Sequence, residues 1–210
     1  MVIDSLKKAE NSLIKIGQSK IQSKIDAEHI LMSVLNKDKF ALYMDYDKEL
    51  SKLEQDAIEK ILIKISDGYP LSYLINRHFF YDDEFYLDEN VLIPRVETEG
   101  IIDKLLEYGD KIYLSKKQCV FVDAGSGSGC VGISIAKKRP HWNIILLDKY
   151  ETVISVLKEN LRNMNISNIN VICGDWLKSI KPNSIDFIFS NPPYVSFTDN
   201  LDDSVSNFDW

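Results

Sequence analysis

The chain has 210 residues, of which 45% are hydrophobic and 27% charged, and its formal net charge is −7 at pH 7. This composition is typical of a folded protein and excludes a disordered one. No long segment is basic, which argues against a large nucleic-acid-binding surface, and no run approaches the ~18 apolar residues of a membrane span. The start of the chain lacks the apolar core of a signal peptide.

The three cysteines are Cys119, Cys130 and Cys173, and none forms a C-x-x-C pair. All lie in or beside apolar runs, so we expect small core residues, with no disulfide framework and no metal site. A soluble, reducing setting follows as the default expectation, which is the cytoplasm, with an organellar matrix as the alternative.

Residues 1–70 predict a small helical bundle, because apolar residues recur there at helical spacing. Asp4 and Asp26 each precede such a pattern, and each is expected to cap a helix. Ser51 and Glu54 form the capping-box pattern at the start of another helix. The apolar face of that helix is expected to contain Leu53, Ala57, Ile61, Leu62 and Ile65.

Residues 71–95 have a different character, and "RHFFYDDEFYLDENVLIPR" contains two aromatic-rich stretches around Asp82 and Asp83. These stretches predict a β-hairpin that links two domains. The segment that follows, "VETEGIIDKLLEYGDKIYL", predicts a helix with Thr98 near its start.

From Cys119 onward, short β-rich runs alternate with helical patterns. The expected strands are "CVFVDAG", "WNIILLD", "INVICGD" and "SIDFIFSN", with "CVGISIAKKR" and "ETVISVLKENLRNMN" as helices. This alternation indicates an α/β fold with parallel strands and crossover helices. If the strands are parallel and lie in chain order, their ends converge on one rim.

A glycine-rich loop, "DAGSGSG", follows the first of these strands and precedes a helix. Glycines allow sharp turns and the close approach of a ligand to main-chain N–H groups. The spacing is neither G-x-G-x-x-G nor that of a P-loop, and the loop carries no cation, which favours a sulfonium ligand over a pyrophosphate. An unoccupied tight turn is the alternative. The candidate binding residues of the loop are Gly125, Ser126, Gly127, Ser128 and Gly129.

Two further strand ends carry acidic residues. Asp148, 25 residues after Asp123, can accept hydrogen bonds from two ribose hydroxyls, or it can cap the following helix. Asp175 can accept from an exocyclic adenine amine, and Trp176 can pack on a flat ring; an ordinary turn is the alternative for Asp175. Asp123 itself can add negative potential or hold N–H groups of the loop.

The last expected strand ends in "NPPY". The oxygen of Asn191 and the carbonyl of Pro192 can accept the two hydrogens of a planar NH2 group, while Tyr194 covers its face. Pro193 adds rigidity. Two fixed acceptors would stabilise charge on a nitrogen as it attacks. A strand-terminating turn is the alternative interpretation.

"DAGSGSG", Asp148, "GDW" and "NPPY", in this order, resemble class I S-adenosylmethionine-dependent amino-methyltransferases. The segment "PLSYLINRHFFYDDEFYLDENVLIPRVETE" resembles the linker of peptide chain release factor glutamine methyltransferases, the HemK/PrmC family. This resemblance covers nearly the whole chain. It implies an N-terminal helical domain over residues 1–70 that docks the release factor, a hairpin linker over 71–95 and a methyltransferase domain over 96–210.

The resemblance also implies a function. Gly125 to Gly129, Asp148, Trp176 and Asn191 would contact S-adenosylmethionine, and Asn191, Pro192, Pro193 and Tyr194 would hold the substrate glutamine of a Gly-Gly-Gln motif. Arg95 would help to shape the site. The expected partner is a release factor, with no direct nucleic acid and no membrane, and the protein is expected to be a monomer.

The chain departs from the resembled family in two places. Val96 stands where family members often have Pro, and the chain stops at Trp210, soon after "NPPY". We therefore expect a Rossmann-like sheet truncated after its fourth strand, with the C-terminal part of the domain missing. Two alternatives stay open: an amino-methyltransferase that acts on an exocyclic base amine of RNA or DNA, and a truncated, non-catalytic binding protein.

Overall fold

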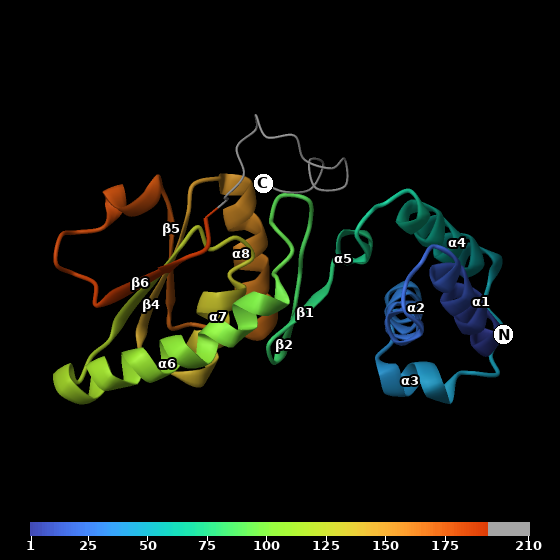
Figure 1. The fold of residues 1–210 in the computed structure, drawn as a ribbon, viewed down its shortest axis with the longest axis horizontal. Coiled ribbons are helices and arrows are strands. Elements are labelled where there is room, and N and C mark those ends of the chain that lie inside the picture. The colour runs from blue at the N-terminus through green and yellow to red at the C-terminus, as the bar shows by residue number, and fades with distance from the viewer. Residues whose placement is uncertain (193–210) are drawn as a thin grey trace. The chain divides into compact units, whose positions relative to one another are not determined.

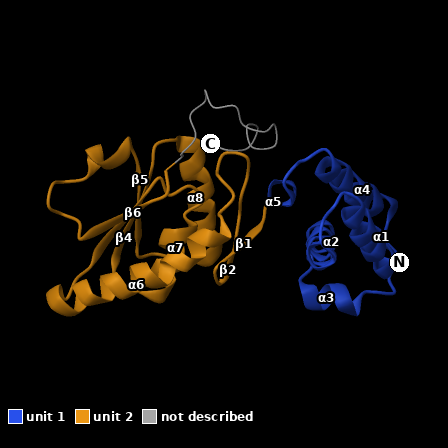
Figure 2. Cartoon of the chain, viewed as in Figure 1, with its two compact units in different colours: residues 1–75 blue, residues 76–210 orange. Residues whose placement is uncertain are grey.

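The computed structural model describes residues 1–192. The chain divides into two compact units, Met1–Ile75 and Asn76–Trp210 (Figures 1 and 2). Among the described residues, no helix is long and apolar enough to cross a bilayer.

The first unit is entirely helical (Figure 1). Ser19 caps the second helix by accepting a hydrogen bond from the backbone N–H of Gln22, and Ser51 forms the predicted capping box with Glu54. The unit consists of α1 (Val2–Lys15), α2 (Lys20–Leu35), α3 (Lys39–Met44), α4 (Lys52–Ser66) and α5 (Leu71–Leu74).

Three details of this unit differ from the sequence-based expectation. The first helix starts before Asp4, and Asp26 lies inside α2, where its carboxylate accepts a hydrogen bond from Gln22; neither residue is a cap. Leu53 is 82% exposed, whereas Ile58 is buried. The rest of the predicted face is covered: Ile65 is buried, and Ile61 and Leu62 pack against the core of this unit. Only Leu53, in the first turn of α4, lies outside it.

The second unit begins with the predicted hairpin, formed by β1 (His78–Phe80) and β2 (Asp83–Phe85). Phe80 and Phe85 are fully buried and meet edge to face with ring centroids 6.2 Å apart. Both belong to the core of the second unit. The hairpin is thus an integral part of this unit's packing.

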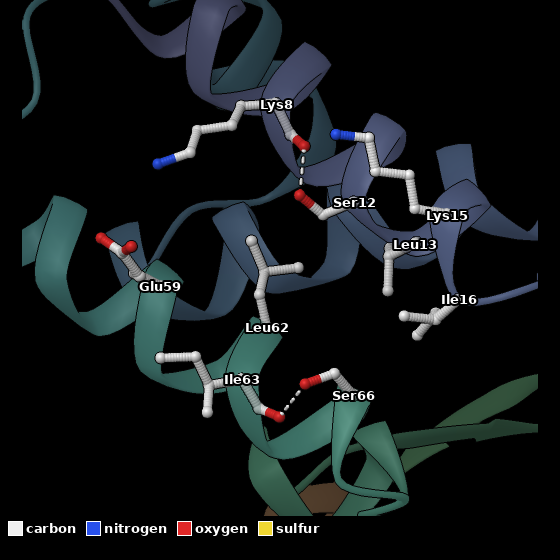
Figure 3. A pocket seen from close by; sticks show the side chains of 9 residues that line it. All are labelled: Lys8, Ser12, Leu13, Lys15, Ile16, Glu59, Leu62, Ile63 and Ser66. Atoms are coloured by element: carbon white, nitrogen blue, oxygen red, sulfur yellow. Dashed lines mark hydrogen bonds between the residues drawn. The ribbon is translucent and has the colours of Figure 1, made fainter.

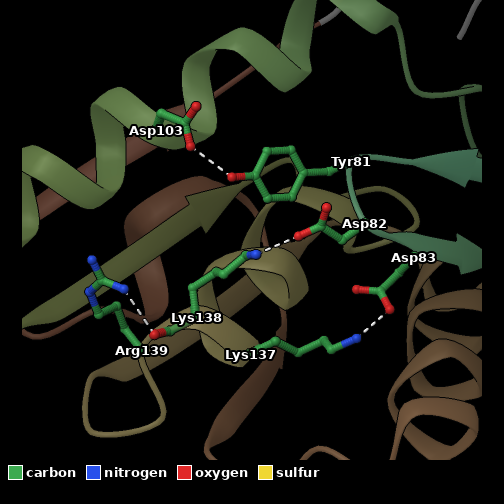
Figure 4. Close-up of polar contacts among 7 residues, drawn as sticks. All are labelled: Tyr81, Asp82, Asp83, Asp103, Lys137, Lys138 and Arg139. Carbon is green, nitrogen blue, oxygen red and sulfur yellow. Dashed lines mark hydrogen bonds and ion pairs between the residues drawn. The ribbon is translucent and has the colours of Figure 1, made fainter.

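Polar contacts fix the turn of the hairpin to two helices, α6 (Val96–Lys116) and α7 (Cys130–Lys138) (Figure 4). Asp82 pairs with Lys138 and Asp83 with Lys137. The hydroxyl of Tyr81 donates a hydrogen bond of 2.7 Å to Asp103 of α6. Exposed ion pairs of this kind contribute little individually, so the buried phenylalanines are the stronger link.

The sheet has four parallel strands in the order β5-β4-β3-β6. Their bounds are Val120–Ala124 for β3, Asn143–Asp148 for β4, Ile169–Cys173 for β5 and Phe187–Ser190 for β6. The parallel direction and the α/β fold class with N-terminal helices are confirmed, but chain order is not: β6 lies on the other side of β3. The short 3-10 helix η1 (Trp176–Ser179) lies in the crossing connection.

One apolar core joins the sheet to α6, α7 and α8 (Glu151–Met164). Close approach requires two glycines. A methyl group on Gly109 would lie 2.1 Å from the ring of Trp142, and one on Gly132 would lie 2.1 Å from Leu146. Cys119 and Cys130 are buried as expected, whereas Cys173 is exposed, because it ends a strand at the sheet edge.

Candidate active site

The carboxyl ends of the parallel strands meet at one edge of the sheet. Ala124, the last residue of β3, pairs with Leu147 of β4 and with Ser190 of β6. The glycine loop, Asp148 and Asn191 therefore lie at the same height along the sheet. This confirms the prediction that the strand ends converge on one rim. Since β4 and β6 lie on opposite sides of β3, the loop sits where the strand order reverses, and open α/β sheets bind ligands at this position.

Positive backbone φ angles shape the glycine loop. They are 75° at Gly125, 53° at Gly127 and 81° at Gly129, which caps α7. A methyl group on Gly129 would meet Ile133 and Leu157 at 3.0 and 3.2 Å, whereas one on Gly125 or Gly127 would meet nothing within 4 Å. Gly129 is thus a packing glycine, and the other two leave open space over the backbone.

Backbone hydrogen bonds attach the first half of the loop to β4. The N–H groups of Gly125 and Ser126 both donate to the carbonyl of Leu147, at 2.8 and 3.1 Å, and the Ser126 hydroxyl donates to the same oxygen at 3.3 Å. The side chains of Ser126 and Ser128 are buried. The two serines therefore act in the architecture of the loop, and its backbone is what faces the open edge.

The carboxylate of Asp148 holds two segments together. Its Oδ2 accepts a hydrogen bond of 3.0 Å from the N–H of Gly127, and its Oδ1 accepts one of 2.7 Å from the N–H of Lys149. The helix α8 is capped at Tyr150, without a side-chain cap. Oδ1 also accepts a longer bond of 3.4 Å from the N–H of Tyr150. A carboxylate has about four acceptor positions, so Oδ2 can accept a further bond from a ligand hydroxyl.

Asp123 is buried under the loop, and its Oδ2 accepts a hydrogen bond of 3.0 Å from the N–H of Gly132 in the first turn of α7. Burial raises the pKa of Asp123 to about 7, and the nearby charge of Asp148 acts in the same direction. The helix N–H lowers the pKa but does not offset the burial. Asp123 thus holds the start of helix α7, whereas the predicted role was to hold N–H groups of the loop.

After β5, Asp175 and Trp176 lie on the surface. The carboxylate of Asp175 pairs with Lys178 of η1, and this pairing lowers its pKa. Trp176 is 53% exposed and has a φ of 51°, which is strained for a large side chain. A strained, exposed aromatic residue beside a strand end is consistent with a surface on which a flat ring packs.

The half-buried Asn191 follows β6 directly. The preceding residue, Ser190, was not singled out by its sequence, yet its hydroxyl donates a hydrogen bond of 2.7 Å to the carbonyl of Ala124. This bond joins the end of β6 to the start of the glycine loop. Pro193 and Tyr194 lie outside the described residues, and Arg95 is the exposed N-cap residue of α6.

A second residue that sequence reasoning missed is Asn160, which is fully buried in α8 and bonded to the carbonyl of Ser128 at 2.9 Å. The sequence did contain a signal for its burial: Asn160 lies at helical spacing from Val153, Val156 and Leu157, and so on the apolar face of the helix. An amide on an otherwise apolar helix face indicates a specific polar partner.

A cavity of about 300 Å³ lies between α1 and α4 of the first unit (Figure 3). Its floor is apolar, and its charged residues are Lys8, Lys15 and Glu59. It contains none of the predicted site residues. Within residues 1–192, no group of His, Cys, Asp and Glu side chains could hold a metal ion.

Comparison with known proteins identifies both units. Residues 4–75 match the PrmC N-terminal domain family, and residues 106–208 match the Methyltransferase small domain family. A release factor glutamine methyltransferase of Francisella tularensis is 31% identical over 199 residues, covering 94% of this chain and 69% of the relative. The corresponding protein of Mycoplasma mycoides is 32% identical over 203 residues, covering 95% and 71%.

Among solved structures, a human methyltransferase 10 domain containing protein is 19% identical, with 53% of this chain and 55% of that chain covered and a TM-score of 0.42. A precorrin-6y C5,15-methyltransferase from Geobacter metallireducens is 18% identical, with the same coverage and a TM-score of 0.38.

The parallel sheet, with its glycine loop where the strand order reverses, defines a methyltransferase of the class I fold. The matches of both units and of the relatives, which span nearly the whole chain, give the particular family. The chain belongs to the release factor glutamine methyltransferases.

Proposed function

We propose that this protein transfers a methyl group from S-adenosylmethionine to the side-chain amide nitrogen of the glutamine in the Gly-Gly-Gln motif of a peptide chain release factor. One observation carries the proposal: the glycine loop, Asp148 and Asn191 follow paired strand ends and so lie together at one edge of the parallel sheet. The names of the relatives support the choice of substrate.

The residues at this edge fit the proposed methyl donor. The backbone at Gly125 and Gly127 borders open space, which a nucleoside or amino-acid moiety can approach closely. Asp148 retains an acceptor position on Oδ2 for a ribose hydroxyl, and Trp176 offers an exposed ring face. The loop has no Lys or Arg, so it does not repel a positively charged sulfonium. When bound, the donor supplies an electrophilic methyl group on that sulfonium.

Asn191 and the residues after it would hold the acceptor amide. The side-chain oxygen of Asn191 and the carbonyl of Pro192 accept the two N–H hydrogens of the glutamine amide, and Pro193 and Tyr194 complete the pocket. An amide nitrogen is a weak nucleophile because its lone pair is delocalised. Two acceptors on its hydrogens favour charge on nitrogen as the N–C bond forms and the C–S bond breaks. The electron pair of the C–S bond stays on sulfur, which gives S-adenosylhomocysteine, and the methylated nitrogen loses one proton to solvent water.

The helical unit would serve the second requirement of the reaction, which is to bind a large protein substrate. In this proposal, residues 1–70 dock the release factor, 71–95 link the domains and 96–210 hold the donor and the glutamine. The protein acts as a monomer in the cytoplasm.

Transfer of tritiated methyl from S-adenosylmethionine tests the proposal, with a release factor, RNA and DNA as separate acceptors. Label in the factor is expected, and it should vanish when the Gly-Gly-Gln glutamine is replaced. Asn191→Ala should lower transfer by at least about a hundredfold while the circular dichroism spectrum stays unchanged. The matched control is Asn170→Ala, an exposed residue in the middle of β5, which should leave transfer intact.

Label in nucleic acid and none in the factor would overturn the choice of substrate. Absence of donor binding by calorimetry, with the factor still bound, would identify a non-catalytic binding protein. Near-normal transfer by Asn191→Ala would contradict the proposed hold on the amide.

A further inference from the structure

The buried residue Asn160 bonds three backbone groups that are distant in sequence. Its Oδ1 accepts a hydrogen bond of 2.7 Å from the N–H of Tyr86. Its Nδ2 donates to the carbonyl of Tyr86 at 3.0 Å and to the carbonyl of Ser128 at 2.9 Å. Asn160 is 0% exposed, and these contacts use both of its donors and one acceptor position.

The two partners belong to different functional segments of the second unit. Tyr86 directly follows β2 and so belongs to the segment after the hairpin. Ser128 lies in the glycine loop between Gly127 and Gly129, both of which have positive φ. The side-chain amide of Asn160 bonds both the N–H and the carbonyl of Tyr86, as the backbone of a neighbouring strand would. Its remaining N–H donates to the glycine loop.

The loop is thereby held from two sides. Its first half is bonded to the end of β4, through the carbonyl of Leu147 and the carboxylate of Asp148. Its second half is bonded to α8 through Asn160. Because the two loop glycines that border open space have little steric restraint of their own, these anchors determine where the backbone groups of the loop point.

We propose that Asn160 is a positioning residue for the methyl donor: it fixes the second half of the glycine loop and couples the loop to the segment that follows the hairpin. This role rests on the proposed function, since it assumes that the donor binds at the loop. Asn160 does not touch the donor, and it acts by holding the carbonyl of Ser128.

The alternative is a buried asparagine that only stabilises the fold, and a matched variant separates the two roles. Asn160→Ser shortens the side chain so that it no longer spans Tyr86 and Ser128. The control, Val156→Ala, removes buried carbon atoms from the same helix without removing a hydrogen bond. Both variants are compared at a temperature at which tryptophan fluorescence shows them to be folded.

Hydrogen exchange of the free protein provides the first measurement. Amide exchange over residues 125–132 should accelerate by about tenfold in Asn160→Ser and by less than about twofold in Val156→Ala, because a lost anchor opens the loop locally. Calorimetry with S-adenosylmethionine provides the second measurement. The dissociation constant should rise by about tenfold in Asn160→Ser, equivalent to about 1.4 kcal/mol, and stay within about twofold in the control.

Equal effects of the two variants on loop exchange, or an unchanged dissociation constant in Asn160→Ser, would overturn the positioning role. If the wild-type protein binds no donor, the proposed function is wrong, and the exchange comparison still decides what Asn160 does. Should Asn160→Ser fail to fold, Asn160→Thr replaces it, because Thr fills more of the buried volume while its hydroxyl is still too short to span Tyr86 and Ser128.

Discussion

Two glycines of the same helix should respond in opposite directions to the same substitution. Gly100 and Gly109 both lie inside α6. Replacement by Ala favours the helix by about 1 kcal/mol at either position, because it reduces the freedom of the unfolded chain. A methyl group on Gly100 meets nothing within 4 Å, so Gly100→Ala should stabilise the second unit by up to about 1 kcal/mol.

At Gly109, the methyl group would lie 2.1, 2.6 and 2.7 Å from three ring atoms of Trp142. An ordinary contact requires about 3.4 Å or more, so the ring or the helix must move by more than an ångström. The ring is rigid and 1% exposed, and it cannot rotate away. Overpacking of this kind costs about 1–3 kcal/mol or more. With three contacts under 3.0 Å, the upper part of this range, about 2–3 kcal/mol, applies. After the helix gain, Gly109→Ala should destabilise the unit by about 1–2 kcal/mol.

Urea unfolding followed by tryptophan fluorescence measures this difference. All three tryptophans lie in the second unit, at positions 142, 176 and 210, so the signal does not mix the two units. The variants should differ by about 2–3 kcal/mol, or roughly 6–9 °C in melting temperature at about 3 °C per kcal/mol. Equal stabilities would show that α6 does not pack on Trp142 as described.

Three further predictions concern charge, capping and the loop. Asp123 has its pKa raised to about 7 by burial, whereas the unfolded chain ionises near pH 4. The native state therefore holds the extra proton between these values, and its free energy of unfolding should fall as pH rises from about 4 to about 7, by at most about 1.4 kcal/mol per pH unit. Asp123→Asn should flatten this dependence in urea titrations at several pH values, and an unchanged slope would contradict the assignment. Ser51→Ala removes one half of the capping box and should destabilise the first unit by about 1 kcal/mol in circular dichroism melts; a loss below about 0.3 kcal/mol would count against the cap. Gly127→Ala places a methyl group where φ is 53° and space is open, so it should cost about 1 kcal/mol of stability. The methyl group should also weaken the binding of S-adenosylmethionine, which calorimetry measures. An unchanged affinity would show that the donor does not bind in the open space at Gly127.

The local signals in the sequence were sufficient for the elements and for the residues that stand at the strand ends. The short β-rich runs and helical patterns after Cys119 predicted the parallel strands and their helices, and Ser51 with Glu54 predicted a helix start that the structure confirms. These features depend on hydrogen bonds and side chains only a few residues apart. The glycine loop, Asp148 and Asn191 were identified for the same reason, because each stands at the end of a strand that its own sequence defines.

Other expectations failed where distant segments decide the outcome. Asp4 has the right residue type for a cap, but α1 begins before it because the N–H groups of Val2 and Ile3 donate to the carbonyls of Lys48 and Tyr46. Asp26 lies inside α2, which begins after its cap residue Ser19. Leu53 fits the apolar stripe of its helix, yet no other helix covers it. The pattern of a single helix cannot indicate how far a neighbour extends over its first turn.

The sequence by itself determined the class of fold, the family resemblance and the residues at the strand ends, since these are properties of short segments. Only the tertiary structure placed β6 beside β3, which brings Asn191 next to the glycine loop and allows Ser190 to bond Ala124. It also gave Asn160 its partners, 74 and 32 residues away. Such contacts depend on which elements pack together, and packing is decided by the burial of whole faces across the chain.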